Sequence, residues 1–384
     1  MQKEITTFQN RTVPGPEVSS GKSFKDIFNI HRLLKFILIM LPLMVLGSTV
    51  YVMLTSEAGS YEYLKKLKFG YLLLAAVMVM IPFFTNSARL YLWSRVINGG
   101  MKPSIAFKAT VVGELGNVTT PTAIGGGYLK LYYLTRQNFN VGQVAMIYLL
   151  GYIEDFIFLI LFLSSTILLT QSWNNPHVLQ AGRAILAHWW VFAIIAGIGI
   201  SFSIYVKNRV NKVKADLPDS HPKGIKGLKN RILSRIQKFE HDMKTAFGLV
   251  WRHGKGTFLT CIMLAIFGWG CRYMAINALI AGMGLHTDIL NYALLHWLVF
   301  TFMTLVPSPG AVGGAEIVFA LIFGGLLPGD MVPVLTGSWR LLTCYLGITF
   351  GAFYLIISGM GLPSRNKFVR KHPEEVLAAQ KTAA

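Results

Sequence analysis

The chain of 384 residues is too apolar for a soluble domain, because 53% of its residues are hydrophobic and only 14% are charged. Soluble domains carry about 25% charged residues, so the composition predicts a polytopic membrane protein. The net charge of +19 would suggest a nucleic-acid partner in a soluble protein. Here the basic residues gather in the loops of one predicted side of a membrane, so we expect no nucleic-acid partner.

Six apolar segments are long enough to cross a bilayer, which takes about 20 helical residues. They lie near 36–54, 69–92, 144–170, 185–206, 257–283 and 333–359. Two further apolar segments, about 105–127 and 289–327, are interrupted by Pro and Gly. Irregular backbone at membrane depth has to be buried in protein or line a wet cavity. We therefore expect an all-α polytopic membrane protein with about six spanning helices and two re-entrant helical hairpins.

Each interrupted segment contains a motif of Pro followed by Gly. The first is Pro121-Thr-Ala-Ile-Gly125-Gly126-Gly127, and the second comprises Pro307, Pro309, Gly310, Gly313 and Gly314. Pro121 to Gly125 and Pro309 to Gly313 have the same spacing. Proline and runs of glycine break helices, so both motifs predict irregular hairpin tips. Opposite orientation of the two halves would make an inverted repeat, which is typical of secondary transporters.

The basic residues predict the topology. Six Lys and Arg lie in 1–35, five in 93–143, thirteen in 206–256 and five after 361, which places both termini in the cytosol of a bacterial inner membrane. Lys65, Lys66 and Lys68 fall on the outer side and count against this topology. The expected order is a cytosolic tail (1–34), a first membrane repeat with extra helices (35–206), a basic amphipathic cytosolic linker (207–255), a second membrane repeat (256–361) and a cytosolic tail (362–384).

Charged residues within apolar segments are the candidates for function, because each costs about 2.5–3.5 kcal/mol at a helix centre. They either form internal ion pairs that fix helix packing, or line a polar cavity for a headgroup or coupling ion. Glu316, near a predicted hairpin tip, and Arg340, on the next span, are the strongest pair. Lys130 is equally compatible with an interfacial position. The candidate substrate-binding residues are Arg89, Glu114, Lys130, Asp155, Arg272, Glu316 and Arg340.

Other chemistry is not indicated. The three cysteines and nine histidines show no metal-ligand spacing, so no metal or cofactor is expected. P-loop, GxSxG and kinase motifs are absent from the sequence, and we expect no enzymatic activity. Trp93 and Trp251, near the ends of spans, are expected in the interfacial aromatic belt.

The segment Pro307-Ser-Pro-Gly-Ala-Val-Gly-Gly-Ala-Glu316, followed by Trp339-Arg-Leu-Leu-Thr343, resembles the lysylphosphatidylglycerol synthase transmembrane-region family, the flippase-like membrane half of MprF proteins. In layout the resemblance covers roughly 35–360. The first half departs from the family pattern: Lys130 stands where Arg is usual, and Asp155 matches while Gly151 and Tyr152 replace Glu and Arg. The aminoacyl-transferase domain of full MprF proteins is absent from this sequence, so the resemblance implies lipid translocation without lipid synthesis.

The main hypothesis is therefore a translocase-like membrane protein that moves a polar-headgroup lipid, such as a phospholipid, between leaflets. Arg272 and Arg340 would attract phosphate, and Glu316 would pair with Arg or with a cationic headgroup. One alternative is a membrane enzyme that transfers a polyprenyl-phosphate-linked sugar, with Glu154 and Asp155 as its acidic pair. Another is a non-transporting scaffold whose basic loop recruits anionic lipid. The sequence does not specify the lipid, the direction, the energy source or the oligomeric state.

Overall fold

The computed structural model describes residues 30–98, 100–120, 125–137, 139–171, 201, 239 and 241–358. These residues are almost entirely helical, and no strand occurs among them. Five of the described helical segments are long and apolar enough to cross a membrane: Ile37–Thr55, Phe69–Ile97, Val141–Leu169, Lys255–Gly282 and Met331–Ile357. The prediction of an all-α polytopic membrane protein is confirmed. The sixth predicted span, 185–206, lies outside the described residues except for residue 201.

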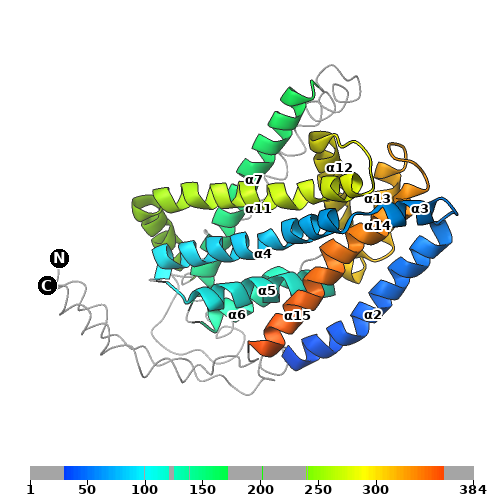
Figure 1. The fold of residues 1–384 in the computed structure, drawn as a ribbon. Coiled ribbons are helices and arrows are strands. Elements are labelled where there is room, and N and C mark those ends of the chain that lie inside the picture. The colour runs from blue at the N-terminus through cyan, green and yellow to red at the C-terminus, as the bar shows by residue number, and fades with distance from the viewer. Residues whose placement is uncertain are drawn as a thin grey trace, which may run out of the picture.

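Two antiparallel helices, α4 (Phe69–Asn98) and α11 (Lys255–Gly282), form the centre of the molecule (Figure 1). Their contact runs along the whole pair, because Gly254 lies beside Trp93 and Gly282 lies beside Tyr71. At the midpoint the helices come very close, since a Cβ on Gly268 would lie 2.3 Å from Thr85 Oγ1. This pair joins the first half of the chain to the second.

The first hairpin consists of α5 (Pro103–Thr119) and α6 (Gly125–Thr135), which pack side by side (Figure 1). Pro103 begins α5, where a missing N–H costs nothing. Thr120 follows α5, and its hydroxyl accepts a hydrogen bond from the N–H of Gly125 at 2.9 Å. The predicted hairpin is present, and Pro121 of its motif lies outside the described residues.

The helix is interrupted at the first motif, since α5 ends at Thr119 and α6 begins at Gly125, but the three glycines themselves lie inside a helix. Gly125, Gly126 and Gly127 form the first turn of α6. Gly126 is needed for close packing, because a Cβ there would lie 2.0 Å from Asn117 Oδ1 and 2.2 Å from the carbonyl oxygen of Gly113 on α5. The glycine therefore lets two helices of the hairpin touch through their backbones, which a side chain would prevent.

The second hairpin consists of α12 (Ile289–Met303), a 3-10 turn (Pro309–Ala311) and α13 (Gly314–Phe323). With 15 and 10 residues, the two helices are about 22 and 15 Å long, too short for a hydrocarbon core of about 30 Å. Gly310, Ala311 and Gly313 have positive φ angles of 61°, 53° and 83°. The second motif therefore does break the helix, in agreement with the sequence prediction.

The two hairpins approach the centre from opposite ends. The first follows the C-terminal end of α4 and the second follows the C-terminal end of α11, and these helices are antiparallel. The tips meet, since a Cβ on Gly310 would lie 3.3 Å from Val118 Cγ1 on α5. This arrangement is the one expected of an inverted repeat.

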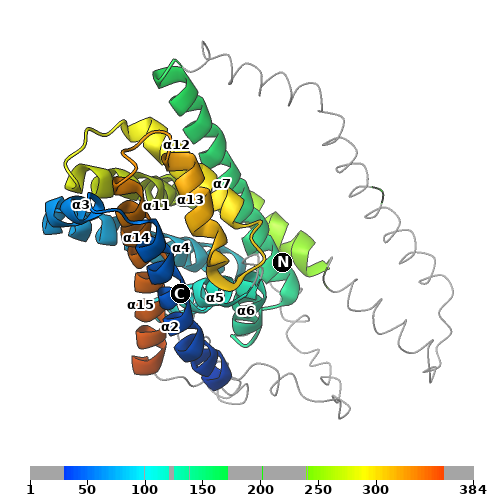
Figure 2. The same ribbon diagram turned by 90° about the vertical axis from the view of Figure 1, so that its right-hand side faces the viewer.

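The last span consists of α14 (Met331–Arg340), a π-helical segment (Leu341–Leu346) and α15 (Gly347–Ile357). The first described span, α2 (Ile30–Thr55), packs against α14 and α15. The beginning of α2 and the end of α15 lie at the same end of the molecule (Figures 1 and 2). At that end Lys108 of α5 donates a hydrogen bond to the carbonyl oxygen of Ser358, at 2.6 Å.

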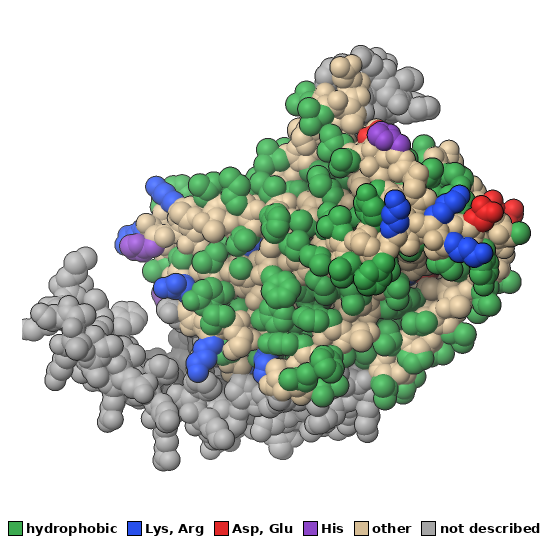
Figure 3. Space-filling model, viewed as in Figure 1, with side chains coloured by type: hydrophobic (Ala, Val, Ile, Leu, Met, Phe, Trp, Pro, Cys, Tyr) green, Lys and Arg blue, Asp and Glu red, His purple; other side chains and the backbone are tan. Residues whose placement is uncertain are grey.

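Three further helical stretches complete the described part: α3 (Ser60–Lys66), α7 (Val141–Leu169) and residues 241–253. The last is the described part of the predicted basic linker, and its Ala246 is buried while Phe247 and Trp251 are exposed. Hydrophobic side chains cover most of the face in Figure 3, and Lys and Arg lie toward the ends of α4 and α11 and around α3. Such a surface suits contact with lipid.

Candidate functional site

A cavity of about 360 Å³ lies where the two hairpins meet. Its wall comes from α5, α11, α12, the tip of the second hairpin and the last span. The polar residues of the wall are Glu114, Asn117, Thr120, Arg272, Thr301, Thr304, Ser308, Arg340 and Thr343. Three of the seven candidate substrate-binding residues, Glu114, Arg272 and Arg340, therefore line one cavity.

Arg272 of α11 enters this cavity between two aromatic rings. Its guanidinium carbon lies 4.8 Å from the ring centre of Phe300 and 5.5 Å from that of Trp269. Its Nε is buried without a hydrogen-bond partner, and no carboxylate among the described residues lies within ion-pair distance of it. Aromatic faces attract a cation but accept no strong hydrogen bond from it. Nε is buried while the side chain as a whole is only partly buried, and Arg272 bonds to no other described residue, so its terminal Nη groups are the donors left for a ligand.

Glu114 of α5 lines the same cavity as Arg272. Within the described part of the chain neither residue forms an ion pair, so the two opposite charges share the cavity without neutralising each other. A buried charge without a partner is costly, and the cost falls when the charge faces water or an oppositely charged ligand. The cavity therefore suits a ligand with a charged group.

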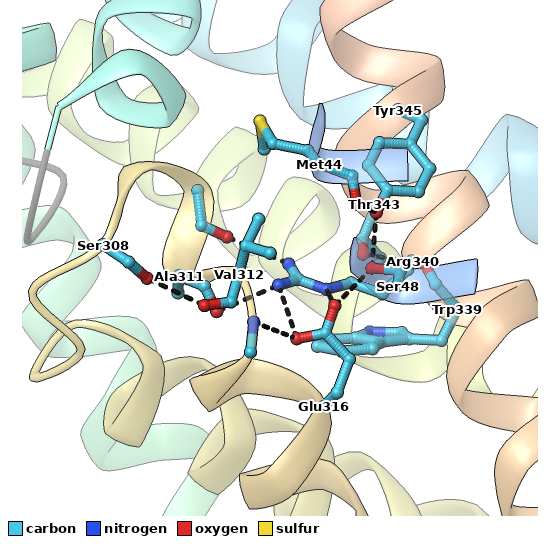
Figure 4. A network of polar contacts seen from close by, with 12 residues as sticks. Met44, Ser48, Ser308, Ala311, Val312, Glu316, Trp339, Arg340, Thr343 and Tyr345 are labelled. Atoms are coloured by element: carbon cyan, nitrogen blue, oxygen red, sulfur yellow. Dashed lines mark hydrogen bonds and ion pairs between the residues drawn. The ribbon is translucent and has the colours of Figure 1, made fainter. Parts of the chain in front are cut away.

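Arg340 and Glu316 form a buried ion pair, which is one of the alternatives that the sequence left open (Figure 4). Both side chains are 1% exposed, and the distance from Arg340 Nε to Glu316 Oε1 is 2.9 Å. Arg340 also donates to the carbonyl oxygens of Gly310 and Ala311, at 3.1 and 3.0 Å. Glu316 Oε2 accepts the N–H of Gly313 at 2.9 Å. The positive φ angles in the second motif turn these backbone groups toward the pair.

The pair is also bonded to α2. Ser48 donates a hydrogen bond to Glu316, and the Tyr345 hydroxyl lies 2.5 Å from Ser48 Oγ and 2.8 Å from the carbonyl oxygen of Met44. Both oxygens of Glu316 are thus occupied by protein groups, and Glu316 does not line the cavity. Of the two interpretations left open by the sequence, this geometry favours helix packing over ligand binding for Glu316 and Arg340.

Arg89 forms a second cluster, which we call the first-half cluster, with Glu154 and Asp155 of α7. Arg89 Nε lies 2.7 Å from Glu154 Oε2, and Arg89 Nη1 lies 2.9 Å from Asp155 Oδ1. Arg89 also donates to the carbonyl oxygen of Gly151 at 3.0 Å. Trp93 is buried and donates to Glu154 at 2.6 Å, so it does not belong to the interfacial belt, where the sequence placed it. Neither Arg89 nor Asp155 lines the cavity.

Lys130 of α6 is half-buried and does not line the cavity either. Its carbon chain lies beside Gly113, and its ammonium lies 5.7 Å from the ring centre of Tyr148. The Tyr148 hydroxyl in turn donates to the carbonyl oxygen of Gly127 at 2.8 Å. These contacts join α6 to α5 and α7.

Several residues of the site were not among the candidates. Trp269 lies three positions before Arg272, on the same face of a helix, so the spacing indicates that the two side chains are neighbours. His296 is fully buried, with Nδ1 3.0 Å from the carbonyl oxygen of Tyr273 and Nε2 2.7 Å from the indole nitrogen of Trp339. Because a carbonyl can only accept, Nδ1 carries the proton and Nε2 accepts from Trp339. No sequence motif indicated this contact.

No group of three His, Cys, Asp or Glu among the described residues could hold a metal ion. The three cysteines are unpaired, with Cys261 and Cys344 buried. The charged groups near the cavity are therefore a set of arginines and carboxylates without the donor geometry of a metal centre.

The fold and the cavity define a polytopic membrane protein with two hairpins of short helices that meet around a charged cavity. A family model described as "Lysylphosphatidylglycerol synthase TM region" matches residues 33–351, and the chain belongs to this family. The chain is also similar to a "UPF0104 membrane protein" of Archaeoglobus fulgidus, with 27% identity over 113 residues, or 29% of this chain. The match covers 33% of that relative.

Proposed function

We propose that the protein binds the headgroup of a polar lipid in the central cavity and moves the lipid between leaflets while its acyl chains stay in the bilayer. One observation carries this proposal: Arg272 lies in the cavity with no acidic partner among the described residues. Arg89 and Arg340, in contrast, are each held by carboxylates and backbone carbonyls. A charge kept free at membrane depth is a functional candidate.

Phosphate is the ligand group that fits Arg272 best. A guanidinium presents several N–H donors in one plane, which matches phosphate oxygens. The rings of Trp269 and Phe300 hold the group in place without using these donors. Hydroxyl and amide groups of the wall, among them Asn117 and Thr304, supply partners for the rest of a headgroup.

The hairpins supply a route to alternating access. They approach the cavity from opposite ends, and in transporters with inverted repeats the halves rock around a central site. Arg95 lies at the C-terminal end of α4, and Lys255 lies at the N-terminal end of α11. Because basic residues gather on the cytosolic side of a membrane, we place these ends, together with the shared end of α2 and α15, at the cytosolic face of a bacterial inner membrane. Both terminal segments would then be cytosolic.

We further propose that the protein is not an enzyme. The sugar-transfer alternative needs a free acidic pair, but Glu154 and Asp155 are both bonded to Arg89 and to indole N–H groups. This occupation leaves them poorly placed to bind a metal-phosphate complex. The scaffold alternative assigns no role to an arginine in a cavity.

The test is a leaflet-resolved assay in proteoliposomes that contain phosphatidylglycerol with an acyl-linked NBD fluorophore, in which dithionite bleaches only the outer leaflet. Arg272→Gln should slow translocation at least about tenfold, as expected for loss of a charged hydrogen bond contributing about 1.5–3 kcal/mol. Arg95→Gln, which removes an exposed arginine outside the cavity, is the matched control and should translocate at the wild-type rate. Wild-type translocation by Arg272→Gln would refute the proposed site.

A further inference from the structure

Within the described part of the chain, one hydrogen bond connects the first-half cluster to the wall of the cavity. The indole Nε1 of Trp269 donates to Asp155 Oδ1 at 2.8 Å. Trp269 lines the cavity and Asp155 does not. The same carboxylate oxygen binds Arg89 at 2.9 Å. Asp155 therefore contacts both the ion cluster on one side and a wall of the cavity on the other.

Asp155 is itself held firmly, because Arg89 is fixed at four points. The guanidinium of Arg89 contacts Glu154 at 2.7 Å, Asn86 Oδ1 at 3.1 Å and the carbonyl oxygen of Gly151 at 3.0 Å, besides Asp155. The Arg89 side chain is 7% exposed. The Asp155 side chain is 34% exposed, but each group in this network restricts the next one, so the bond to Arg89 gives Asp155 Oδ1 a defined place as an acceptor.

Trp269 uses this acceptor to set the angle of its ring. One edge of the indole is bonded to Asp155, and its ring stacks on Tyr273 with centres 5.6 Å apart and 17° between planes. Arg272 lies over the Trp269 ring at 5.5 Å. A rotation of the indole would break the bond to Asp155 and remove one of the two rings that hold the guanidinium.

We propose that Asp155 is a positioning residue for anion binding: it holds Trp269 so that Trp269 and Phe300 keep Arg272 pointed into the cavity. The carboxylate does not touch the headgroup. The role rests on the proposed function, because it concerns how tightly the headgroup phosphate is bound at Arg272. Through Trp269, the first-half cluster would also influence the position of Arg272, which lies in the second half of the chain.

The hydrogen bond between Asp155 and Trp269 can be tested separately from the negative charge of Asp155. Asp155→Ala removes the acceptor, and Trp269→Phe removes the N–H while a ring remains beside Arg272. Each should raise the half-saturating content of NBD-phosphatidylglycerol in the proteoliposome assay about fivefold, since a hydrogen bond contributes about 1 kcal/mol. The double variant should be no weaker than Asp155→Ala alone, because both changes remove the same bond.

Asp155→Asn is the conservative variant, because its amide oxygen can still accept the Trp269 N–H. We expect half-saturation close to wild type for this variant. If Asp155→Asn is as weak as Asp155→Ala, the negative charge itself matters and the positioning role is wrong. The maximal rate and the melting temperature of every variant are measured alongside, so that a loss of folded protein is not mistaken for a loss of affinity.

The results distinguish the two proposals. Wild-type half-saturation for Trp269→Phe, or additive effects in the double variant, combined with a defective Arg272→Gln, would overturn the positioning role and leave the proposed function intact. Wild-type behaviour of Arg272→Gln would overturn both. The expected pattern is a defect in Arg272→Gln, a smaller and non-additive defect in Asp155→Ala and Trp269→Phe, and recovery in Asp155→Asn.

Discussion

Replacing Glu316 by Gln would remove the charge from the buried pair with Arg340 and leave the size of the side chain almost unchanged. Both partners are 1% exposed, so the remaining guanidinium would stay buried without its counter-charge. Breaking a buried ion pair by removal of one partner costs about 3–5 kcal/mol. Because the carbonyls of Gly310 and Ala311 still accept from Arg340, we expect the lower end, about 3 kcal/mol.

The assay is thermal unfolding of the purified protein in detergent, followed by the loss of the monodisperse peak in size-exclusion chromatography. The unfolding entropy is about 2.1 cal/mol/K per residue, or roughly 0.8 kcal/mol/K for 384 residues. A loss of about 3 kcal/mol in Glu316→Gln should therefore lower Tm by about 4 °C. Arg272→Gln is the matched control, because it removes a charge at membrane depth that has no ion pair with any residue that the structure describes, and Tm should not fall. Equal Tm values for Glu316→Gln and wild type would refute the packing role of this pair.

Three further predictions concern helix contacts. Gly126→Ala should separate α5 from α6 and destabilise by about 2 kcal/mol or more, whereas Gly127→Ala, whose Cβ would meet nothing within 4 Å, should leave Tm unchanged. Lys108→Met should lower stability by about 1 kcal/mol through loss of the bond to Ser358, measured in the same Tm assay. In Gly313→Ala the new Cβ meets nothing within 4 Å, but the residue keeps a φ of 83°. Any loss of unfolding free energy, expected at about 1–2 kcal/mol, therefore reports backbone strain alone. An unchanged Tm would show that the turn relaxes.

The sequence predicted the large features well because they depend on hydrophobicity and charge. Apolar length located the spans within the described residues, and the second motif located a true break, since Gly310 and Gly313 both have positive φ. The pairing of Glu316 with Arg340 followed from the cost of a lone charge in lipid. These inferences needed no knowledge of which helices are neighbours.

The roles of individual charges were harder to predict, because they depend on contacts between helices far apart in the chain. Asp155, which follows Glu154, and Arg272 were both candidates in the sequence as charges in apolar spans. Only the packing of the helices shows that Asp155 is bonded to Arg89 and Trp269, whereas Arg272 has no ion-pair partner among the described residues. Similarly, the first motif does interrupt the helix between Thr119 and Gly125, but the sequence did not show that Gly126 is needed inside α6 for the close approach of α5.

The π-helical segment Leu341–Leu346 has a mechanical consequence. On one side of it, Arg340 fastens α14 to the tip of the second hairpin. On the other side, α15 packs against α5 of the first hairpin, with Gly351 beside Leu115. A π-helical turn interrupts the regular hydrogen-bond ladder, so α14 and α15 can bend relative to each other at this turn. We therefore expect a movement that separates the hairpin tips to bend the last span at Leu341–Leu346.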